Sequence, residues 1–488
     1  MRGPFAFPDE DLTRDVPVAS GVVRMGTSRG RWVLGATIAG SSLAMLDGTV
    51  VNVALAQIGT DFDAGFTALQ WIVNAYTLTL AALILLGGVL GDLYGRRRVF
   101  LVGVVWFAVA SALCALSTGE GLLVAARALQ GVGGALLTPG SLAIISATFD
   151  RRDRARAIGA WSGLGGIAGA VGPFLGGWLV EVSWRLVFLV NLPVAATIVA
   201  VALRHVPESR DTELVADGSR RVDLPGAVLV VAALSGITYA LTEAGRDGWT
   251  PVLLVVGLAG LTAGVAFVLL ERRAPHPLVQ LHMFADRVFA VTNVATVFIY
   301  ASLSVYFFLL VLQLQVVSGW SPLAAGTSIL PVTACMLLLS ARAGGLAQRI
   351  GPRPLMTLGP LLAATGFVLA LRVGPDARYL TAVLPSVLLL GLGLACSVAP
   401  LTAAVLAAAP SHLAGATSGI NNATARSAGL LAIAVVPAVA GLGGAASGDP
   451  VALGRGFALA MVIAAVMLAA AAGVSWFGLG RAGSRPLG

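Results

Sequence analysis

Long apolar runs alternate with short polar segments along the whole chain. A helix needs about 20 apolar residues, each adding about 1.5 Å, to cross the hydrocarbon core of a membrane. Fourteen runs reach that length, and they lie at 32–55, 68–91, 98–117, 119–141, 158–180, 186–206, 224–244, 250–270, 288–314, 321–341, 354–373, 379–404, 416–441 and 455–478. The pattern therefore predicts an all-α membrane protein with fourteen transmembrane helices.

The arginines test this helix count, because cytoplasmic loops of membrane proteins carry an excess of basic residues. If the N-terminus lies inside, 24 of the 31 basic residues fall in cytoplasmic segments and five fall outside. The remaining two, Arg127 and Arg426, lie within helices. A missed or invented helix would exchange the sides of all later loops and remove this bias. We expect a multi-pass protein of the cell membrane with both termini in the cytoplasm.

Composition narrows the classes of function. Only 11% of the residues are charged and 57% are hydrophobic, whereas soluble domains are about 25% charged. All basic residues are arginine, so a nucleotide site of the P-loop type, which needs a lysine, is excluded. Three isolated cysteines form neither a disulfide framework nor a zinc motif. The net charge of +8 is explained by arginines in the predicted cytoplasmic loops, so it does not indicate a nucleic-acid-binding surface. We expect no cofactor, no metal and no nucleic-acid partner.

One internal repeat indicates how the helices are grouped. Gly88–Arg97 follows the second helix, and the similar segment Gly344–Arg353 follows the tenth, 256 residues later, with Gln348 in place of Asp92. Repeats of this kind are typical of secondary transporters with two lobes. We therefore expect two six-helix lobes with an inserted helix pair between them.

The predicted domains follow from this grouping. They are an N-terminal cytoplasmic tail 1–31, a first lobe 32–206, linkers with the inserted helix pair 207–287, a second lobe 288–478 and a cytoplasmic tail 479–488.

Asp47 lies within the first predicted helix. A charge at the centre of a bilayer costs roughly 2.5–3.5 kcal/mol on insertion scales, and intramembrane acids are functional by default. The side chain could bind a proton or a cation, or it could make a structural hydrogen bond between helices. Asn52 lies five residues further on, so it is expected on a different face of the helix.

Arg127 in the fourth helix is the expected partner of Asp47. At 1.5 Å per residue, Asp47 lies roughly 22 Å from the inner face and Arg127 about 12 Å from the outer face of a core of about 30 Å. Their depths then agree within about 5 Å, so we expect the two side chains to interact. Alternatively, Arg127 only binds backbone carbonyl groups. Gln130 shares its helix face, and Asn74 on the second helix lies at a similar depth.

Several polar side chains are candidates for lining a substrate cavity. Arg426, which shares a face with Asn422, could contact an anionic substrate or tie the thirteenth helix to its neighbours. The aromatic and amide residues of the ninth helix could line a pore or pack in the core. The candidate set is Asn74, Gln130, Tyr300, Tyr306, Gln313 and Arg426.

The fifth helix carries a stripe of small residues. Gly165, Gly169, Gly172 and Gly176 fall on one face, and Pro173 removes a helix hydrogen bond beside them. Such a stripe allows close backbone contact with another helix.

Taken together, these motifs resemble the major facilitator superfamily, in its fourteen-helix drug:proton antiporter subfamily. Leu46–Leu55 is similar to the subfamily's helix-1 motif, although Ala56 follows where proline is usual. Gly88–Arg97 resembles the superfamily loop motif, with Leu93 where a basic residue is usual. The segments 127–134 and 172–177 resemble the motifs of helices 4 and 5.

The resemblance implies roles for two groups of residues. Asp47 would be the proton-coupling carboxylate, with Arg127 as its neighbour. The loop residues would form a cytoplasmic latch between the lobes, and this set is Asp92, Gly95, Arg96 and Arg97.

The function that this reading predicts is proton-coupled export of amphipathic small molecules by alternating access, with the proton gradient as the energy source. The cargo would be drugs or antibiotics, including compounds that the cell makes itself. The expected partners are small molecules, protons and the lipid bilayer, and we expect the protein to be a monomer. The alternative is an exporter of sugars or amino acids with the same fold, which a narrow ligand range would distinguish. An enzyme would need His, Asp or Cys clustered at one membrane face, and the sequence shows no such cluster.

Overall fold

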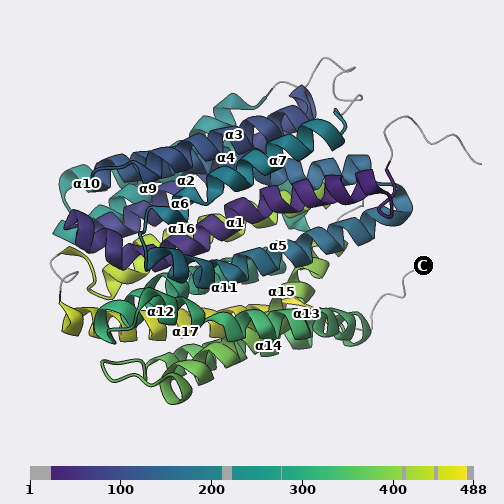
Figure 1. The fold of residues 1–488 in the computed structure, drawn as a ribbon. Helices are drawn as coiled ribbons and strands as arrows, with labels where there is room; N and C mark the ends of the chain where they lie inside the picture. The colour runs from purple at the N-terminus through teal and green to yellow at the C-terminus, as the bar shows by residue number, and fades with distance from the viewer. Residues whose placement is uncertain (1–22, 211–221, 276, 409–413, 445–448, 481–488) are drawn as a thin grey trace, which may run out of the picture.

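The computed structural model describes residues 23–210, 222–275, 277–408, 414–444 and 449–480 (Figure 1). Most of the predicted N-terminal tail, part of the linker before the inserted pair and most of the C-terminal tail lie outside these residues.

The predicted fourteen-helix bundle is confirmed. Thirteen helices in the described residues are long and apolar enough to cross a membrane, and α5 is a further helix of 30 residues. The first lobe consists of α1 (Ser28–Phe62), α2 (Phe66–Tyr94), α3 (Arg96–Ala115), α4 (Glu120–Thr148), α5 (Arg151–Val180), α6 (Leu186–Leu189) and α7 (Asn191–His205). The short α6 runs on into α7, so the two together make one crossing.

The inserted pair and the second lobe complete the chain. The pair is α9 (Leu224–Asp247) and α10 (Pro251–Glu271). The second lobe consists of η1 (Leu281–Ala285), α11 (Arg287–Leu312), η2 (Gln313–Val317), α12 (Pro322–Thr327), α13 (Leu330–Ile350), α14 (Pro352–Ala370), η3 (Tyr379–Val383), α15 (Leu384–Ala407), α16 (Ala414–Val439) and α17 (Pro450–Gly478).

Capping residues fix where several of these helices begin. The side chains of Asp223, Thr250 and Asp286 accept hydrogen bonds from backbone N–H groups in the first turns of α9, α10 and α11. These bonds satisfy donors that have no partner within the helix. Proline follows the cap in the first turns of α9 and α10, where it costs no hydrogen bond.

The inserted pair packs across the seam between the lobes. In Figure 1 the helices α2, α3, α4 and α7 occupy the upper part of the view, and α13, α14 and α17 occupy the lower part. Helix α9 packs against α2 of the first lobe and α16 of the second, whereas α10 packs against α9. Exposed leucine and valine side chains along α10, such as Leu258 and Val265, leave an apolar surface that suits lipid.

The internal repeat appears in the backbone as well as in the sequence. Gly95 between α2 and α3 has a φ of 109°, and Gly351 between α13 and α14 has a φ of 84°. Both values lie in the region that residues with a Cβ rarely adopt. The two loops therefore turn in the same way, and glycine is required at the same place in each.

The two lobes are held together at one end of the bundle. We call the end where α1 begins and α17 ends the terminal end, and the other end the closed end. Gln70 Nε2 donates to the carbonyl oxygen of Ile433 at 2.7 Å, and Gln315 Nε2 donates to that of Val53 at 3.0 Å. The rings of Phe66 and Phe308 meet edge to face at 5.7 Å. All three contacts lie in the half of the bundle near the closed end.

Glycines allow the lobes to touch at the closed end. A Cβ on Gly326 of α12 would collide with the carbonyl oxygen of Pro173, and one on Gly177 of α5 would lie 2.6 Å from the carbonyl oxygen of Pro322. The backbones of α5 and α12 therefore meet directly, and no side chain can be added there without moving the lobes apart.

We expect Gly326→Val to open the closed end. Overpacking costs about 1–3 kcal/mol, which is a shift of about fivefold to 150-fold in a conformational equilibrium. Spin labels at the exposed positions Val182 and Leu380, in a variant without the three native cysteines, measure the separation of the lobes. Gly345→Val, where a Cβ meets nothing within 4 Å, is the matched control. Unchanged label distances in Gly326→Val would show that this contact does not hold the lobes together.

Candidate functional site

Asp47 is the centre of a buried polar cluster inside the first lobe. Its carboxylate is fully buried in α1. It accepts hydrogen bonds from Arg127 Nη1 at 2.5 Å, from Gln130 Nε2 at 2.8 Å and from Asn191 Nδ2 at 3.1 Å. The interaction between Asp47 and Arg127 that their depths predicted is therefore confirmed.

Arg127 is held on several sides at once. Its Nε donates to the carbonyl oxygen of Ile72 at 3.1 Å, and Nη1 also donates to Gln130 Oε1. The guanidinium lies over the Tyr76 ring, 4.3 Å from its centre, an arrangement that favours a cation. The alternative that Arg127 only binds backbone carbonyl groups is therefore wrong, because it pairs with Asp47 as well as with the carbonyl oxygen of Ile72.

A second layer orients the groups around the carboxylate. Ser111 Oγ on α3 accepts from Gln130 Nε2 at 2.8 Å and from Asn191 Nδ2 at 3.2 Å. Tyr76 donates its hydroxyl proton to the carbonyl oxygen of Ala44, one turn before Asp47. No motif in the sequence marked Ser111, Tyr76 or Asn191 as site residues. The one feature of the sequence that could have indicated these residues is that each has a polar side chain within an apolar helix.

The cluster balances its charges and is sealed in this conformation. Asp47 and Arg127 are both almost completely buried. Removing one partner of such a pair costs about 3–5 kcal/mol, because the other charge stays buried without compensation.

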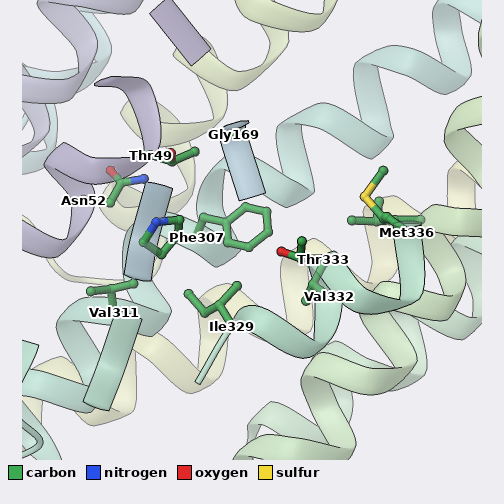
Figure 2. A pocket seen from close by; sticks show the side chains of 11 residues that line it. Thr49, Asn52, Gly169, Phe307, Val311, Ile329, Val332, Thr333 and Met336 are labelled. Carbon is green, nitrogen blue, oxygen red and sulfur yellow. The ribbon is translucent and has the colours of Figure 1, made fainter. Parts of the chain in front are cut away.

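An apolar cavity lies between the lobes, on the other face of α1 (Figure 2). Its volume is about 180 Å³. The Phe307 ring lies between Asn52 and Thr333 in this view. The lining residues come from both lobes, and they are Thr49, Asn52, Gly169, Pro173, Phe307, Val311, Ile329, Val332, Thr333, Met336 and Leu394. Asn52 thus faces the cavity while Asp47 faces the first lobe, as their spacing predicted.

Three of the predicted cavity residues lie elsewhere. The Tyr306 hydroxyl is hydrogen-bonded to Ser386 Oγ, and its ring stacks on Phe367 inside the second lobe. Gln313 is buried and donates to the carbonyl oxygen of Val373. Gln130 belongs to the Asp47 cluster. Tyr306 does not line the cavity because neighbouring residues of a helix point about 100° apart, and it is Phe307 that faces the cavity.

The other three candidates lie near the seam between α2 and α16. Arg426 is partly buried and its Nε donates to Asn422 Oδ1 at 3.1 Å. Tyr300 is partly buried and lies within electrostatic range of Arg426. Asn74 is fully buried, and neither atom of its amide has a hydrogen-bond partner in the described residues.

The glycine stripe of α5 packs against α1, the helix that carries Asp47. Virtual Cβ atoms on Gly165 and Gly169 would touch Met45 at 3.7 and 3.8 Å. A Cβ on Gly172 would collide with Thr49 Oγ1, and one on Gly176 would lie 3.0 Å from the carbonyl oxygen of Val50. This close contact couples α1 to α5, the helix that meets α12 of the second lobe.

The predicted latch residues make their ion pairs inside the first lobe. Asp92 Oδ1 accepts from Arg96 Nε at 2.9 Å. Glu208, which follows α7, accepts from the backbone N–H of Arg97 at 3.1 Å and lies within 3.8 Å of the guanidinium groups of Arg97 and Arg98. Glu208 could not be predicted from the sequence, since no motif links it to the loop.

Asp92→Asn tests whether this loop acts as a latch when the terminal end closes. In that state Asp92 would cap the N-terminus of a helix of the second lobe, where an anion contributes about 0.3–1 kcal/mol, up to about 2 kcal/mol when partly buried. We expect transport to slow about twofold to thirtyfold, while equilibrium cargo binding stays unchanged. Initial export rates and binding constants of the variant are compared with those of the unaltered protein. An unchanged export rate would rule out the latch.

The sequence and the fold are both similar to those of known proteins. The model of the Major Facilitator Superfamily matches residues 37–434. Multidrug resistance protein Stp of Mycobacterium tuberculosis is 36% identical over 411 residues, which cover 83% of this chain and 74% of that protein. Cephamycin export protein CmcT of Amycolatopsis lactamdurans is 36% identical over 437 residues, which cover 88% of each chain. The structure of a D-xylose-proton symporter superposes with a TM-score of 0.65 at 17% identity, covering 93% of this chain and 99% of that one, which shows a shared fold.

Proposed function

This chain belongs to the major facilitator superfamily, and from that premise we propose that it exports amphipathic small molecules, drugs or antibiotics, in exchange for protons. It is a multi-pass membrane transporter rather than an enzyme. The observation that supports the proposed proton coupling is that the Asp47 carboxylate is buried in the first lobe and paired with Arg127.

The proton step follows from the balance of charge in the cluster. Protonation of Asp47 removes the negative charge that Arg127 neutralises, and the guanidinium is then a buried cation without a counter-ion. Its remaining partners are the Tyr76 ring, Gln130 Oε1 and the carbonyl oxygen of Ile72, and these neutral groups compensate only in part. Movement of Arg127 would be transmitted through α1 and its glycine contact with α5 to the seam between the lobes. Proton binding would in this way change which end of the bundle is open.

The nature of the cargo is supported by the relatives and by the cavity. The names of Stp and CmcT describe multidrug resistance and cephamycin export for those proteins. The cavity is lined mainly by apolar side chains, with Asn52 and the two threonines as polar points. A lining of this kind binds an amphipathic molecule better than a sugar, whose hydroxyl groups each need a polar partner.

The orientation and the oligomeric state complete the proposal. The excess of arginine in the loops at the terminal end supports a cytoplasmic position for that end, with both termini on the cytoplasmic side of the cell membrane. Each lobe pair encloses its own cavity, so a monomer would be sufficient for transport.

A panel of antibiotics and metabolites in proteoliposomes tests the function. An imposed pH gradient should drive movement of several amphipathic compounds, and an ionophore that removes the gradient should stop it. Transport of one sugar or amino acid alone would favour the metabolite exporter. Movement of amphipathic compounds against their own concentration gradient without a pH gradient would contradict proton coupling.

A further inference from the structure

Arg426 differs from the other arginine within the bundle in having no counter-ion. Arg127 is paired with Asp47, whereas no carboxylate among the described residues forms an ion pair with Arg426. The electrostatic neighbours of its guanidinium are the hydroxyl groups of Tyr76 and Tyr300. An uncompensated charge at this depth in a membrane protein is expensive unless it faces water or a ligand.

The guanidinium retains free donors that border accessible space. Arginine has five N–H groups, and in the described part of the chain Arg426 uses only its Nε, toward Asn422. The side chain is partly buried rather than sealed, and its Nη groups are not among the enclosed atoms that lack partners. They can therefore bind an anion through two parallel hydrogen bonds.

Helix register places Arg426 in the middle of the seam. Gln70 pairs with Ile433 near the closed end, and a Cβ on Gly419 would lie 3.3 Å from Leu85 toward the terminal end. Between these two points the antiparallel helices α2 and α16 bring Arg426 opposite Thr77. Asn74, whose buried amide has no partner, lies one turn nearer the closed end on the same side of α2 as Gln70.

An apolar surface adjoins this cation. Tyr300 lies two helical turns from Phe307 on α11, so both side chains share one helix face. Phe307 lines the apolar cavity, and Tyr300 is an electrostatic neighbour of Arg426. A ligand on this face would meet aromatic and aliphatic groups at one end and a guanidinium at the other.

We propose that Arg426 is the anion-binding group of the cargo site, and that the preferred cargo is an amphipathic carboxylic acid with an apolar aromatic body. This inference rests on the proposed export function. Asp47 and Arg127 cancel each other, so the middle of the seam has a net positive charge in the described residues. A carboxylate supplies the missing counter-ion, a neutral molecule does not, and an amine adds a second positive charge.

A purely structural role for Arg426 would leave a different pattern. A side chain that ties α16 to its neighbours would be hydrogen-bonded to another helix, whereas the single bond to Asn422 stays within α16. Side-chain hydrogen bonds between α16 and α11 are made by Asn421, which donates to Asn293 Oδ1 and Thr296 Oγ1. Arg426 is therefore not needed to hold this helix pair together.

Three pyrene probes that differ only in charge test the proposal. We would measure binding of 1-pyrenebutyric acid, its primary amide and 1-pyrenebutylamine to the purified full chain in nanodiscs, with empty nanodiscs subtracted. The acid should bind at least about tenfold more tightly than the amide or the amine, as expected for charge-assisted hydrogen bonds. Arg426→Gln should abolish this preference, and its midpoint of thermal unfolding, compared with that of the unaltered protein, shows whether the variant is folded.

Two further variants separate the site from bulk charge. Arg426→Lys keeps the positive charge and should keep the acid as the preferred probe, and Arg455→Gln removes a charge from an exposed arginine and should alter nothing. An acid that binds no better than its amide, or that does not bind, contradicts the proposal, as does a preference that survives Arg426→Gln. Because binding is measured without any gradient, a failure of proton coupling would leave these results unaffected.

Discussion

Asp47→Asn is expected to reduce proton-driven export to the level of protein-free liposomes. Asparagine has nearly the same shape and can still accept hydrogen bonds from Gln130 and Asn191, but it cannot take up a proton in the relevant range. The transporter would still bind cargo and exchange it between the two sides, because the cavity lies on another face of α1. The loss should therefore affect driven transport and spare exchange down a cargo gradient.

Export with an imposed pH gradient and counterflow without one measure these two activities separately. Asp247→Asn, which changes an exposed carboxylate at the end of α9, is the matched control and should export normally. The double variant Asp47→Asn/Arg127→Gln, in which no buried charge is left over, guards against misfolding. Normal driven export by Asp47→Asn would show that the proton binds elsewhere.

Arg127→Gln is expected to be the most destabilising single change in the first lobe. It leaves the Asp47 carboxylate buried without a counter-ion, at a cost of about 3–5 kcal/mol. Adding Asp47→Asn should recover most of this loss, since it removes the carboxylate charge that Arg127→Gln leaves without a counter-ion. Midpoints of denaturant or thermal unfolding in one detergent measure all four proteins of this cycle.

The sign of the coupling in that cycle is the decisive result. If the losses of stability in the two single variants simply add in the double variant, the two residues do not depend on each other and the ion pair is not a functional unit. Arg455→Gln provides the comparison for loss of an exposed arginine.

The sequence was sufficient for the helix number, the lobes and the central ion pair. The uneven distribution of arginine over the loops constrained the helix count, and 1.5 Å per residue was enough to bring Asp47 and Arg127 to one depth. The repeated loop was visible as a glycine in register, and the positive φ of Gly95 and Gly351 explains why glycine is there.

The sequence could not determine which way each helix faces. Helices of a membrane bundle are apolar on all sides, so hydrophobic periodicity does not indicate the buried face. The sequence therefore could not distinguish Tyr306 and Gln313, whose side chains point into the second lobe, from Phe307 and Tyr300, whose side chains do not. Asn191 was missed because α6 and α7 bring it to Asp47 from a distant part of the sequence.

Proton movement driven by cargo alone tests the central claim most directly. Proteoliposomes that enclose a pH indicator, with no pH gradient, receive a gradient of the compound that the panel shows to be exported best. We predict that protons move against the cargo in the unaltered protein and that Asp47→Asn shows no proton movement. Cargo transport without proton movement, or proton movement that persists in Asp47→Asn, would contradict the account.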